Sequence, residues 1–367
     1  MSAMRLPSGV YHENYTQDHA WWQTRFVWIR MMVVGLILFV AIPYYAISNG
    51  QLYYLALANT VGYTILGAMG VQLLVGYTGQ VTLGHAAFIA VGGYTSSIAM
   101  LQWGIPYPVT IVLAALVAGV WSVLFGLPSA RVKGFYLIMT TMAAQFVTVE
   151  FIITQYVAQI GGRGHYFSLP PGTITIGPIL FGDRENDIKV YYLMLVLVIA
   201  CTVFLANLLR TRVGRAWIAI RDNDIAAEVL GVNIVRYKLL AFFVAGMLGG
   251  ITGAFWVSNL SAISPEHFQF SWSLWLVGVI LIGGTGSMYG TVFGSLFMTL
   301  IPEALKVIIL TLTPYHPIFT QLLDKFLYVR EATFGLVIVL FLLYEPKGLA
   351  YRWAQIKNYI HLWPFSY

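Results

Sequence analysis

Long apolar runs, broken by short polar or Gly-rich stretches, fill most of the chain. About ten runs are suited to crossing a bilayer, at residues 31–48, 53–75, 84–102, 108–127, 135–158, 190–209, 237–258, 271–283, 288–311 and 332–345. Only helices or closed barrels satisfy their backbone hydrogen bonds in lipid, and these runs are too continuously apolar for the alternating strands of a barrel. The pattern therefore predicts an all-α fold, a polytopic helical membrane protein with about ten transmembrane helices.

Composition supports a membrane protein and excludes a soluble domain. The chain of 367 residues is 59% hydrophobic and only 9% charged, whereas soluble domains carry about 25% charged residues. No Asp, Glu, Lys or Arg occurs from Met31 to Ala130. The single cysteine, Cys201, excludes an intrachain disulfide and a paired-cysteine metal site. We therefore expect no metal centre in this chain.

The distribution of Lys and Arg predicts the orientation. With ten crossings and the N-terminus inside, fourteen of the 20 Lys and Arg residues lie on the side of both termini. The positive-inside rule then places both termini in the cytoplasm. It also accounts for the formal net charge of +6, so no nucleic-acid partner is expected.

This topology divides the chain into three parts. We expect a cytoplasmic N-terminal tail at 1–30, a transmembrane domain at 31–346, and a cytoplasmic C-terminal tail at 347–367. Within the transmembrane domain, the loop 159–189 faces outward, either to meet an external partner or as a plain connection. The basic loop 210–236 faces the cytoplasm.

The loop 210–236 contains two short helical patterns. Asp222, Asn223 and Asp224 offer N-cap oxygens to the second helix, and Gly231 suits the position after its end. Ile225 and Val229 give this helix an apolar face. An isolated helix of two turns is unstable in water. The segment therefore either folds back or docks into a partner; the alternative is a basic anchor that only fixes topology.

The stretch GYTGQVTLGHAAFIAVGGYT, at residues 76–95, interrupts the apolar pattern with glycines and polar groups. Irregular backbone at membrane depth is tolerated only beside protein or a water-filled cavity. An interrupted helix exposes N–H groups that attract a carboxylate and carbonyls that attract an ammonium group. An ionisable residue at membrane depth is a functional candidate. Glu150 and Glu303 are such residues; the alternative for each is a hydrated position near the membrane interface. The candidate translocation path comprises Thr78, Gly79, Gln80, Thr82, Thr141, Gln145, Glu150 and Thr285.

Small residues recur at helical spacing in two places. Such strips usually mark close packing of helices; the alternative is a broken helix that lines a cavity. His85, beside the first strip, is expected to be a neutral, hydrogen-bonded packing residue. The predicted packing residues are Gly84, Ala86, Ala90 and Gly93 in the first strip, and Gly286, Gly290 and Gly294, expected on one helix, in the second.

Four segments in order resemble permease subunits of branched-chain amino acid ABC importers. They are GYTGQVTLGHAAF, GRAWIAIRDNDIAAEVLGVNIVRYKLLAFFVAGMLGGITGAFW, SPEHFQFSWSLWLVGVILIGGTGSMYGTVFGSLFMTLIPE and FGLVIVLFLLYEPKGLA, which together span about 75–350. The chain is similar to the member of the permease pair with the long cytoplasmic loop. The resemblance implies an ATPase-coupling segment, although the loop departs from the fuller Glu-Ala-Ala…Gly form. Its residues are Asp222, Ala226, Ala227, Glu228, Leu230 and Gly231.

The resemblance also implies the partners. These are a second homologous permease subunit in a heterodimer, two cytoplasmic ATPase subunits, a periplasmic solute-binding protein and the bilayer of the bacterial inner membrane. The chain contains no G-x-x-x-x-G-K-[ST] phosphate-binding loop. ATP and Mg²⁺ are therefore expected in the partner ATPases, with no cofactor and no enzymatic activity in this chain. The alternatives are a urea or short-amide importer of the same family and an ion-coupled secondary transporter.

Overall fold

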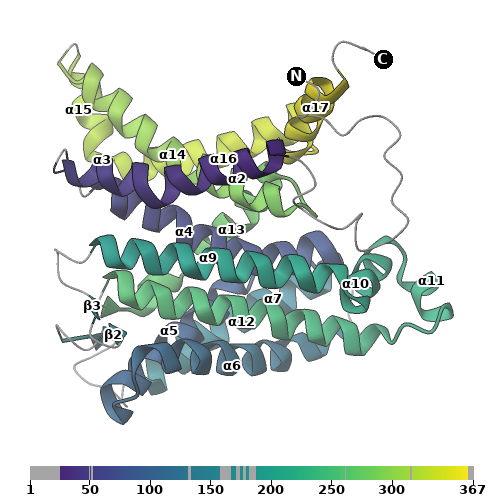
Figure 1. Ribbon diagram of the computed structural model, residues 1–367. Helices are drawn as coiled ribbons and strands as arrows, with labels where there is room; N and C mark the ends of the chain where they lie inside the picture. The colour runs from purple at the N-terminus through teal and green to yellow at the C-terminus, as the bar shows by residue number, and fades with distance from the viewer. Residues whose placement is uncertain are drawn as a thin grey trace. The chain divides into compact units, whose positions relative to one another are not determined.

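The computed structural model describes residues 25–48, 50, 53–130, 134–157, 167–170, 174–176, 179–181, 187–260, 262–314 and 316–362. Two compact units are present, Met1–Ala58 and Asn59–Tyr367, with the boundary inside helix α4 (Tyr53–Val71). Nearly all described residues are helical, in agreement with the predicted fold class (Figure 1).

The first unit contains one long helical stretch ahead of α4. It consists of α2 (Arg25–Leu36), the π-helical segment η1 (Ile37–Ala41) and α3 (Ile42–Ser48). The helix begins at Arg25, inside the predicted tail 1–30, whereas its part that is long and apolar enough to cross a membrane begins at Met31; residues 1–24 of the tail lie outside the described part. The sequence RFVWIR at its start is already largely apolar, which allows the helix to extend beyond the continuous apolar run.

Three helices form the centre of the second unit. They are α5 (His85–Trp103), α6 (Tyr107–Gly126) and α12 (Ile234–Leu260), which pack against one another (Figure 1). Glycines of α12 permit the close approach: a Cβ at Gly249 would lie 3.1 Å from Cβ of Phe88, and one at Gly250 would lie 2.8 Å from Cα of Ala115. Backbones that approach this closely gain dispersion contacts, the main source of helix association in lipid.

The remaining elements extend this centre. Helix α4 ends in the π-helical segment η2 (Gln72–Tyr77), and α6 ends in the 3-10 segment η3 (Leu127–Ala130). Helix α7 continues into the π-helical segment η4, and α13 and α14 meet at a glycine-containing turn. The other bounds are α7 (Phe135–Phe146), η4 (Val147–Val157), α9 (Asp187–Arg210), α10 (Arg212–Asp222), α11 (Asp224–Val229), η6 (Pro265–Phe268), α13 (Phe270–Gly283), α14 (Met288–Leu312), α15 (Pro317–Asp324), α16 (Phe326–Tyr344) and α17 (Leu349–Leu362).

Short strands occur in the connections. β1 (Phe167–Ser168) pairs antiparallel with β4 (Ala262–Ile263), and β2 (Ile174–Ile176) pairs antiparallel with β3 (Ile179–Phe181). Much of the predicted outward loop 159–189 lies outside the described residues. Helix α17 occupies most of the predicted C-terminal tail.

Each predicted apolar run corresponds to a helix, and eight helices among the described residues are long and apolar enough to cross a membrane. The other two, α5 and α13, are helical at the predicted places. Helix α13 has 14 residues, or roughly 21 Å at a rise of 1.5 Å per residue, less than a bilayer core of about 30 Å. The count of about ten crossings therefore stays a prediction, as does the cytoplasmic side of both termini.

Candidate translocation path and coupling loop

The predicted break at residues 76–82 is shifted in the structure: Gly76 and Tyr77 are the last residues of η2, and the non-helical segment before α5 covers residues 79–84. The helix ends where the Thr78 hydroxyl donates to the Leu74 carbonyl at 2.6 Å and the Gln80 backbone N–H donates to the same carbonyl at 2.8 Å. Gly79 has φ +68°, which reverses the chain direction at this point. The Gln80 side-chain amide donates to the Thr78 hydroxyl at 3.0 Å. Both polar side chains are buried.

Three side chains bind the backbone N–H groups around the start of α5. The N–H of Leu83 donates to the Thr141 hydroxyl at 3.1 Å, and that of Ala86 donates to the Ser273 hydroxyl at 2.9 Å. The N–H of Ala87 donates to Oε1 of Gln145 at 2.7 Å. The N–H groups at a helix start are the ones that bind anions. In this conformation the protein itself occupies them.

Gln145 joins three segments at this point. Besides accepting from α5, its side-chain amide donates to the Phe268 carbonyl at the end of η6, at 2.6 Å. The Ser273 hydroxyl of α13 lies 3.4 Å from the same Gln145 oxygen. Thr82, Thr141 and Gln145 are thus brought together as predicted candidates, all with at most 1% exposure. Ser273 was missed by the sequence analysis, although a hydroxyl inside the apolar run 271–283 marked it.

The last turn of η2, which contains Gly76, and the turn between α13 and α14, which contains Gly286, meet beside the loop 210–236. A Cβ on Gly76 would lie 2.5 Å from the backbone nitrogen of Gly286, so the chains touch where no side chain intervenes. The Gln72 side-chain amide donates to the carbonyls of Gly284 at 3.1 Å and of Ser287 at 2.8 Å. On the loop side, Nη1 of Arg221 donates to the Gly76 carbonyl at 2.9 Å. Gln72 and Arg221 were not among the predicted site residues.

The two predicted loop helices are present as α10 and α11. Trp217 of α10 is fully buried, and its indole N–H donates to the Tyr237 carbonyl at 2.8 Å, which fixes α10 to the start of α12. Asn223 is the N-cap of α11, and its side chain accepts from the Ala226 N–H at 3.0 Å. Of the three candidate cap residues, Asn223 fills the role.

A Schellman motif ends α11 at the predicted glycine. The Gly231 N–H donates to the Glu228 carbonyl at 2.9 Å and the Val232 N–H donates to the Ala227 carbonyl at 3.0 Å. Gly231 has φ +85°, a conformation that glycine adopts without steric cost. Ala227 faces the protein at 2% exposure. The opposite side of α11 is apolar and exposed, with Ile225 at 69%, Val229 at 83% and Leu230 at 82%.

Other predicted path residues lie apart from this cluster. Glu150 is on the exposed side of η4, and Thr285 is exposed in the turn between α13 and α14. Thr285 precedes Gly286, which has φ +77°. The expectation that Gly286 shares one helix with Gly290 and Gly294 is wrong, because α14 begins at Met288. A glycine placed four residues before a helical strip has the same sequence signature whether it lies in the helix or in the turn.

The close approach predicted for the small residues is seen at several of them. A Cβ on Gly290 would lie 2.7 Å from the Gly283 carbonyl oxygen, and one on Gly294 would lie 3.1 Å from the Gly283 Cα. In the first strip, a Cβ on Gly93 would lie 2.6 Å from Cδ1 of Ile263, and one on Gly84 would lie 3.1 Å from the carbonyl carbon of Thr141. Ala86 and Ala90 are fully buried.

His85 packs as predicted but lacks the predicted hydrogen bond. It is fully buried and makes an edge contact with Phe88, at 5.7 Å between ring centroids. Neither ring nitrogen has a hydrogen-bond partner among the described residues. Its ring fills the space that Gly70 of α4 leaves open.

An aromatic cluster that the sequence analysis did not single out lies between α4, α12 and α13. Tyr63 contacts Trp256 at 4.6 Å and Trp272 at 5.5 Å between ring centroids. Trp272 stacks on Trp275, which stacks on Phe334 of α16. The cluster packs the ends of these helices, because large rings bury much apolar area.

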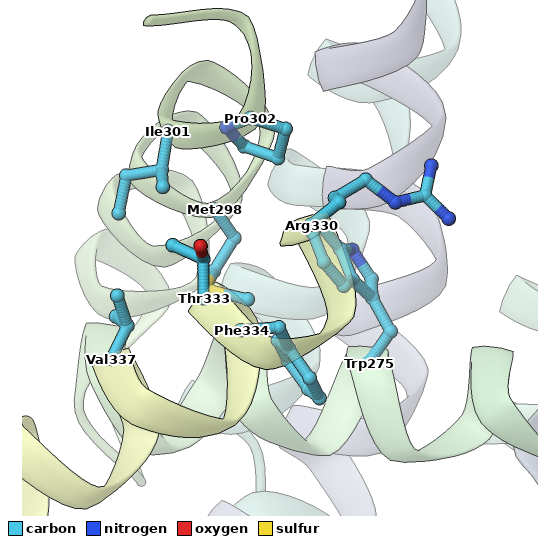
Figure 2. A pocket seen from close by; sticks show the side chains of 8 residues that line it. All are labelled: Trp275, Met298, Ile301, Pro302, Arg330, Thr333, Phe334 and Val337. Carbon is cyan, nitrogen blue, oxygen red and sulfur yellow. The ribbon is translucent and has the colours of Figure 1, made fainter. Parts of the chain in front are cut away.

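Near this cluster, a small hollow with a volume of about 10 Å³ lies between α13, α14 and α16 (Figure 2). Its lining is almost wholly apolar, and the guanidinium of Arg330 points away from the other lining side chains in Figure 2. The Thr333 hydroxyl donates a hydrogen bond to the Val329 carbonyl, at 2.8 Å. Without inward polar groups, this hollow is unsuited to a zwitterionic solute. It is lined by Trp275, Met298, Ile301, Pro302, Arg330, Thr333, Phe334 and Val337.

Outside the membrane-spanning helices, His267 of η6 has a perturbed pKa. Burial lowers its pKa below 6.5, and the nearby Glu266 carboxylate partly offsets the shift. Nδ1 of His267 accepts from the Ser264 N–H at 3.3 Å and completes a capping box with the Ser264 hydroxyl. Among the described residues, no group of three or more His, Cys, Asp or Glu side chains could hold a metal ion.

Comparisons with known proteins give a consistent result. The family model described as the permease component of branched-chain amino acid transport systems matches residues 53–342. The high-affinity branched-chain amino acid transport system permease protein LivM of Escherichia coli (strain K12) is 27% identical over 299 residues, which cover 75% of this chain and 68% of that protein.

Two further relatives carry the same designation. LivM of Salmonella typhimurium is 27% identical, over 67% of this chain and 62% of its own length. A probable branched-chain amino acid permease LivM of Methanocaldococcus jannaschii is 26% identical, over 65% and 66% respectively. The chain thus spans about two thirds of the length of these relatives. No solved structure gives a significant match.

Proposed function

Because the chain belongs to the family of permease components of branched-chain amino acid transport systems, we propose that it is a transmembrane subunit of an ABC importer. The importer moves branched-chain amino acids into the cell by alternating access. The chain is a multi-pass membrane protein, placed by this proposal in the bacterial inner membrane. Separate ATPase subunits bind ATP and Mg²⁺ and supply the energy.

One observation carries the proposal beyond family membership: α11 presents an apolar surface that the described part of the chain leaves exposed. Ile225, Val229 and Leu230 are each more than two-thirds exposed, on a short helix held by caps at both ends. Exposed apolar groups on an ordered helix mark a protein interface. The proposed function requires that this face of α11 dock into a groove on an ATPase subunit.

The partners follow from the same proposal. A second homologous permease subunit completes the pathway, two ATPase subunits dock on the side of α11, and a periplasmic binding protein delivers the solute on the opposite side. With the loop 210–236 in the cytoplasm, the termini are cytoplasmic as well. The path includes the segment 78–84 and the cluster around Gln145, where helix starts lie in the protein interior.

The cluster around Gln145 suits an amino acid on chemical grounds. A carboxylate binds backbone N–H groups at a helix start, and an ammonium group binds carbonyls. In the present conformation Thr141, Gln145 and Ser273 occupy those N–H groups. Solute binding at these N–H groups therefore requires that the start of α5 separate from α7 and α13, as alternating access demands.

Docking of α11 can be tested by co-purification of the ATPase subunits with the tagged permease. Val229→Asp places a charge on the exposed apolar face, and we expect it to lower ATPase recovery tenfold or more. Ile356→Asp, at a 50% exposed position of α17, is the matched control and leaves recovery unchanged. Full ATPase recovery with Val229→Asp contradicts the proposed interface.

A further inference from the structure

Arg221 joins the coupling loop to both glycine-containing turns. Its Nη1 donates to the Gly76 carbonyl at 2.9 Å. The same nitrogen lies 2.9 Å from the position that a Cβ on Gly286 would take, and Cγ of Arg221 lies 3.2 Å from that of a Cβ on Gly79. One side chain of α10 therefore fills the corner between the end of η2 and the start of α14.

The guanidinium is oriented by the residue next to it. Nε and Nη2 of Arg221 donate to Oδ1 of Asp222 at 3.1 Å and 3.0 Å. This ion pair is solvent-exposed, with side-chain exposures of 39% and 62%, so it adds little stability by itself. Its effect is geometric: it fixes the planar fork so that Nη1 faces the Gly76 carbonyl.

Arg221 is also rigidly connected to α11. Asp222 directly precedes Asn223, the N-cap whose backbone carbonyl and side chain start α11. Since α11 is closed by a Schellman motif at its other end, a displacement of α11 moves Asp222 and Arg221 with it. The two turns are then displaced at Gly76 and Gly286.

Hydrogen bonds hold the two turns together, but two buried acceptors beside them lack donors among the described residues. Gln72 donates to Gly284 and Ser287 from inside the protein. However, Oε1 of Gln72 and Oε1 of Gln80 are buried and accept no hydrogen bond from described residues. Unsatisfied buried acceptors weaken this conformation relative to one in which they find donors, such as water in an opened path.

We propose that Arg221 is a positioning residue that latches the turns at Gly76 and Gly286 together and transmits the movement of α11 to them. With the latch made, the end of the path nearest α11 is closed; with the latch broken, Gly76 and Gly286 separate and the segment 78–84 becomes accessible. This inference rests on the proposed function, because only a partner that moves α11 gives the latch its purpose.

The test uses a reporter cysteine at a buried position of the break. Thr78, at 3% exposure, is replaced by Cys in a chain with Cys201→Ser, and the complete importer is reconstituted in nanodiscs. The rate of modification by a hydrophilic maleimide is measured without nucleotide. We expect slow modification with Arg221, and at least tenfold faster modification with Arg221→Ala, because a charge-assisted hydrogen bond shifts an equilibrium by about that factor.

Two variants make the test specific. Arg221→Lys keeps the charge, but a single ammonium cannot reproduce the fork, so its labelling rate falls between the other two. Arg215→Ala removes an exposed arginine of the same helix that donates to the Arg210 carbonyl at 3.4 Å, and labels like the unaltered chain. The second readout is ATP hydrolysed per leucine transported. It rises at least tenfold in Arg221→Ala and stays constant in Arg215→Ala.

Equal labelling and equal coupling in Arg221→Ala and Arg215→Ala overturn the latch. Should Arg221→Ala fail to assemble, Arg221→Lys decides: labelling and coupling equal to those of Arg215→Ala overturn the inference, and faster labelling supports it. Failure of the unaltered importer to take up leucine contradicts the proposed function instead. The labelling rates, which need no transport, still decide on the latch.

Discussion

The side-chain amide of Gln145 donates to the backbone carbonyl of Phe268 at 2.6 Å, which ties α7 to the turn between α12 and α13. Its oxygen accepts from Ala87 at the start of α5. Gln145 is 1% exposed, so both bonds form away from solvent. One side chain therefore fixes the relative positions of the helix starts that the proposed path uses.

Gln145→Ala should destabilise the protein, because it leaves the Phe268 carbonyl buried without its donor and leaves the Ala87 N–H with only the Gly84 carbonyl, at 3.2 Å, as acceptor. We expect a loss in the free energy of unfolding of about 1–3 kcal/mol, measured by SDS titration in mixed micelles. Met139→Ala, at a 53% exposed position on the same helix, is the control. A Gln145→Ala protein as stable as the control contradicts this role.

Gly231→Val should impair coupling while the membrane domain stays folded. A β-branched residue at φ +85° is strained, and we expect the Schellman motif to open at a cost of roughly 1–2 kcal/mol or more. Uptake should fall at least fivefold, with solute capture by the binding protein unchanged. Gly231→Asn, which tolerates the left-handed conformation, should retain most uptake, and equal uptake by both variants speaks against the cap.

Trp217→Ala should release α10 from α12. The fully buried ring contributes about 3–5 kcal/mol, and its N–H bond to the Tyr237 carbonyl contributes about 1 kcal/mol more. Hydrogen exchange of residues 212–231 should accelerate strongly in Trp217→Ala and modestly in Trp217→Phe. Unchanged exchange in both variants shows that the loop does not depend on this anchor.

Because the pKa of His267 is lowered, we expect the local stability of the segment 262–268 to depend on pH. Its folded-state pKa lies below 6.5 because burial disfavours the charged ring. Above about pH 7 the ring is neutral in both folded and unfolded states, so pH has no effect there. As pH falls through about 6.5, the unfolded segment binds protons first, and the local stability decreases until the folded-state pKa is passed. Protonation also removes the Nδ1 acceptor for Ser264.

This pH effect is measured as hydrogen exchange of residues 262–268 between pH 7.5 and 5, corrected for the intrinsic exchange rate. His267→Gln keeps a cap acceptor without titrating in this range. The faster exchange at low pH should therefore vanish in His267→Gln. An acid response that persists in the variant assigns the effect to another group.

Local features could be predicted from the sequence because their causes lie within a few residues. The apolar runs gave the helices, and Asn223 with Gly231 marked both ends of α11. Sequence alone also indicated a break near Gly79. By contrast, Arg221 and Gly76 are 145 residues apart, and Gln145 and Phe268 are 123 apart. No local pattern specifies which distant carbonyl a guanidinium or an amide will reach.

Errors of the sequence reading have the same origin. Gly286 continues the spacing of Gly290 and Gly294, yet it lies in the turn with φ +77°, because Ser287 is the N-cap of α14 and accepts from the Gly290 N–H. Glu150 was a candidate because it is an acid within an apolar run; its side of η4 is exposed in this chain, and its place on the path stays a prediction. The face of a helix that becomes buried depends on which other helices pack against it, and the periodicity of the sequence does not identify those helices.

The most direct test of the account is uptake of radiolabelled leucine by proteoliposomes that contain this chain, its partner permease and the two ATPase subunits, with binding protein outside and ATP inside. We predict uptake that requires hydrolysable ATP, requires the ATPase subunits, and persists when a protonophore collapses the ion gradient. Uptake that needs no ATPase subunit and stops with the protonophore would contradict the account, as would uptake of urea or short amides in place of leucine.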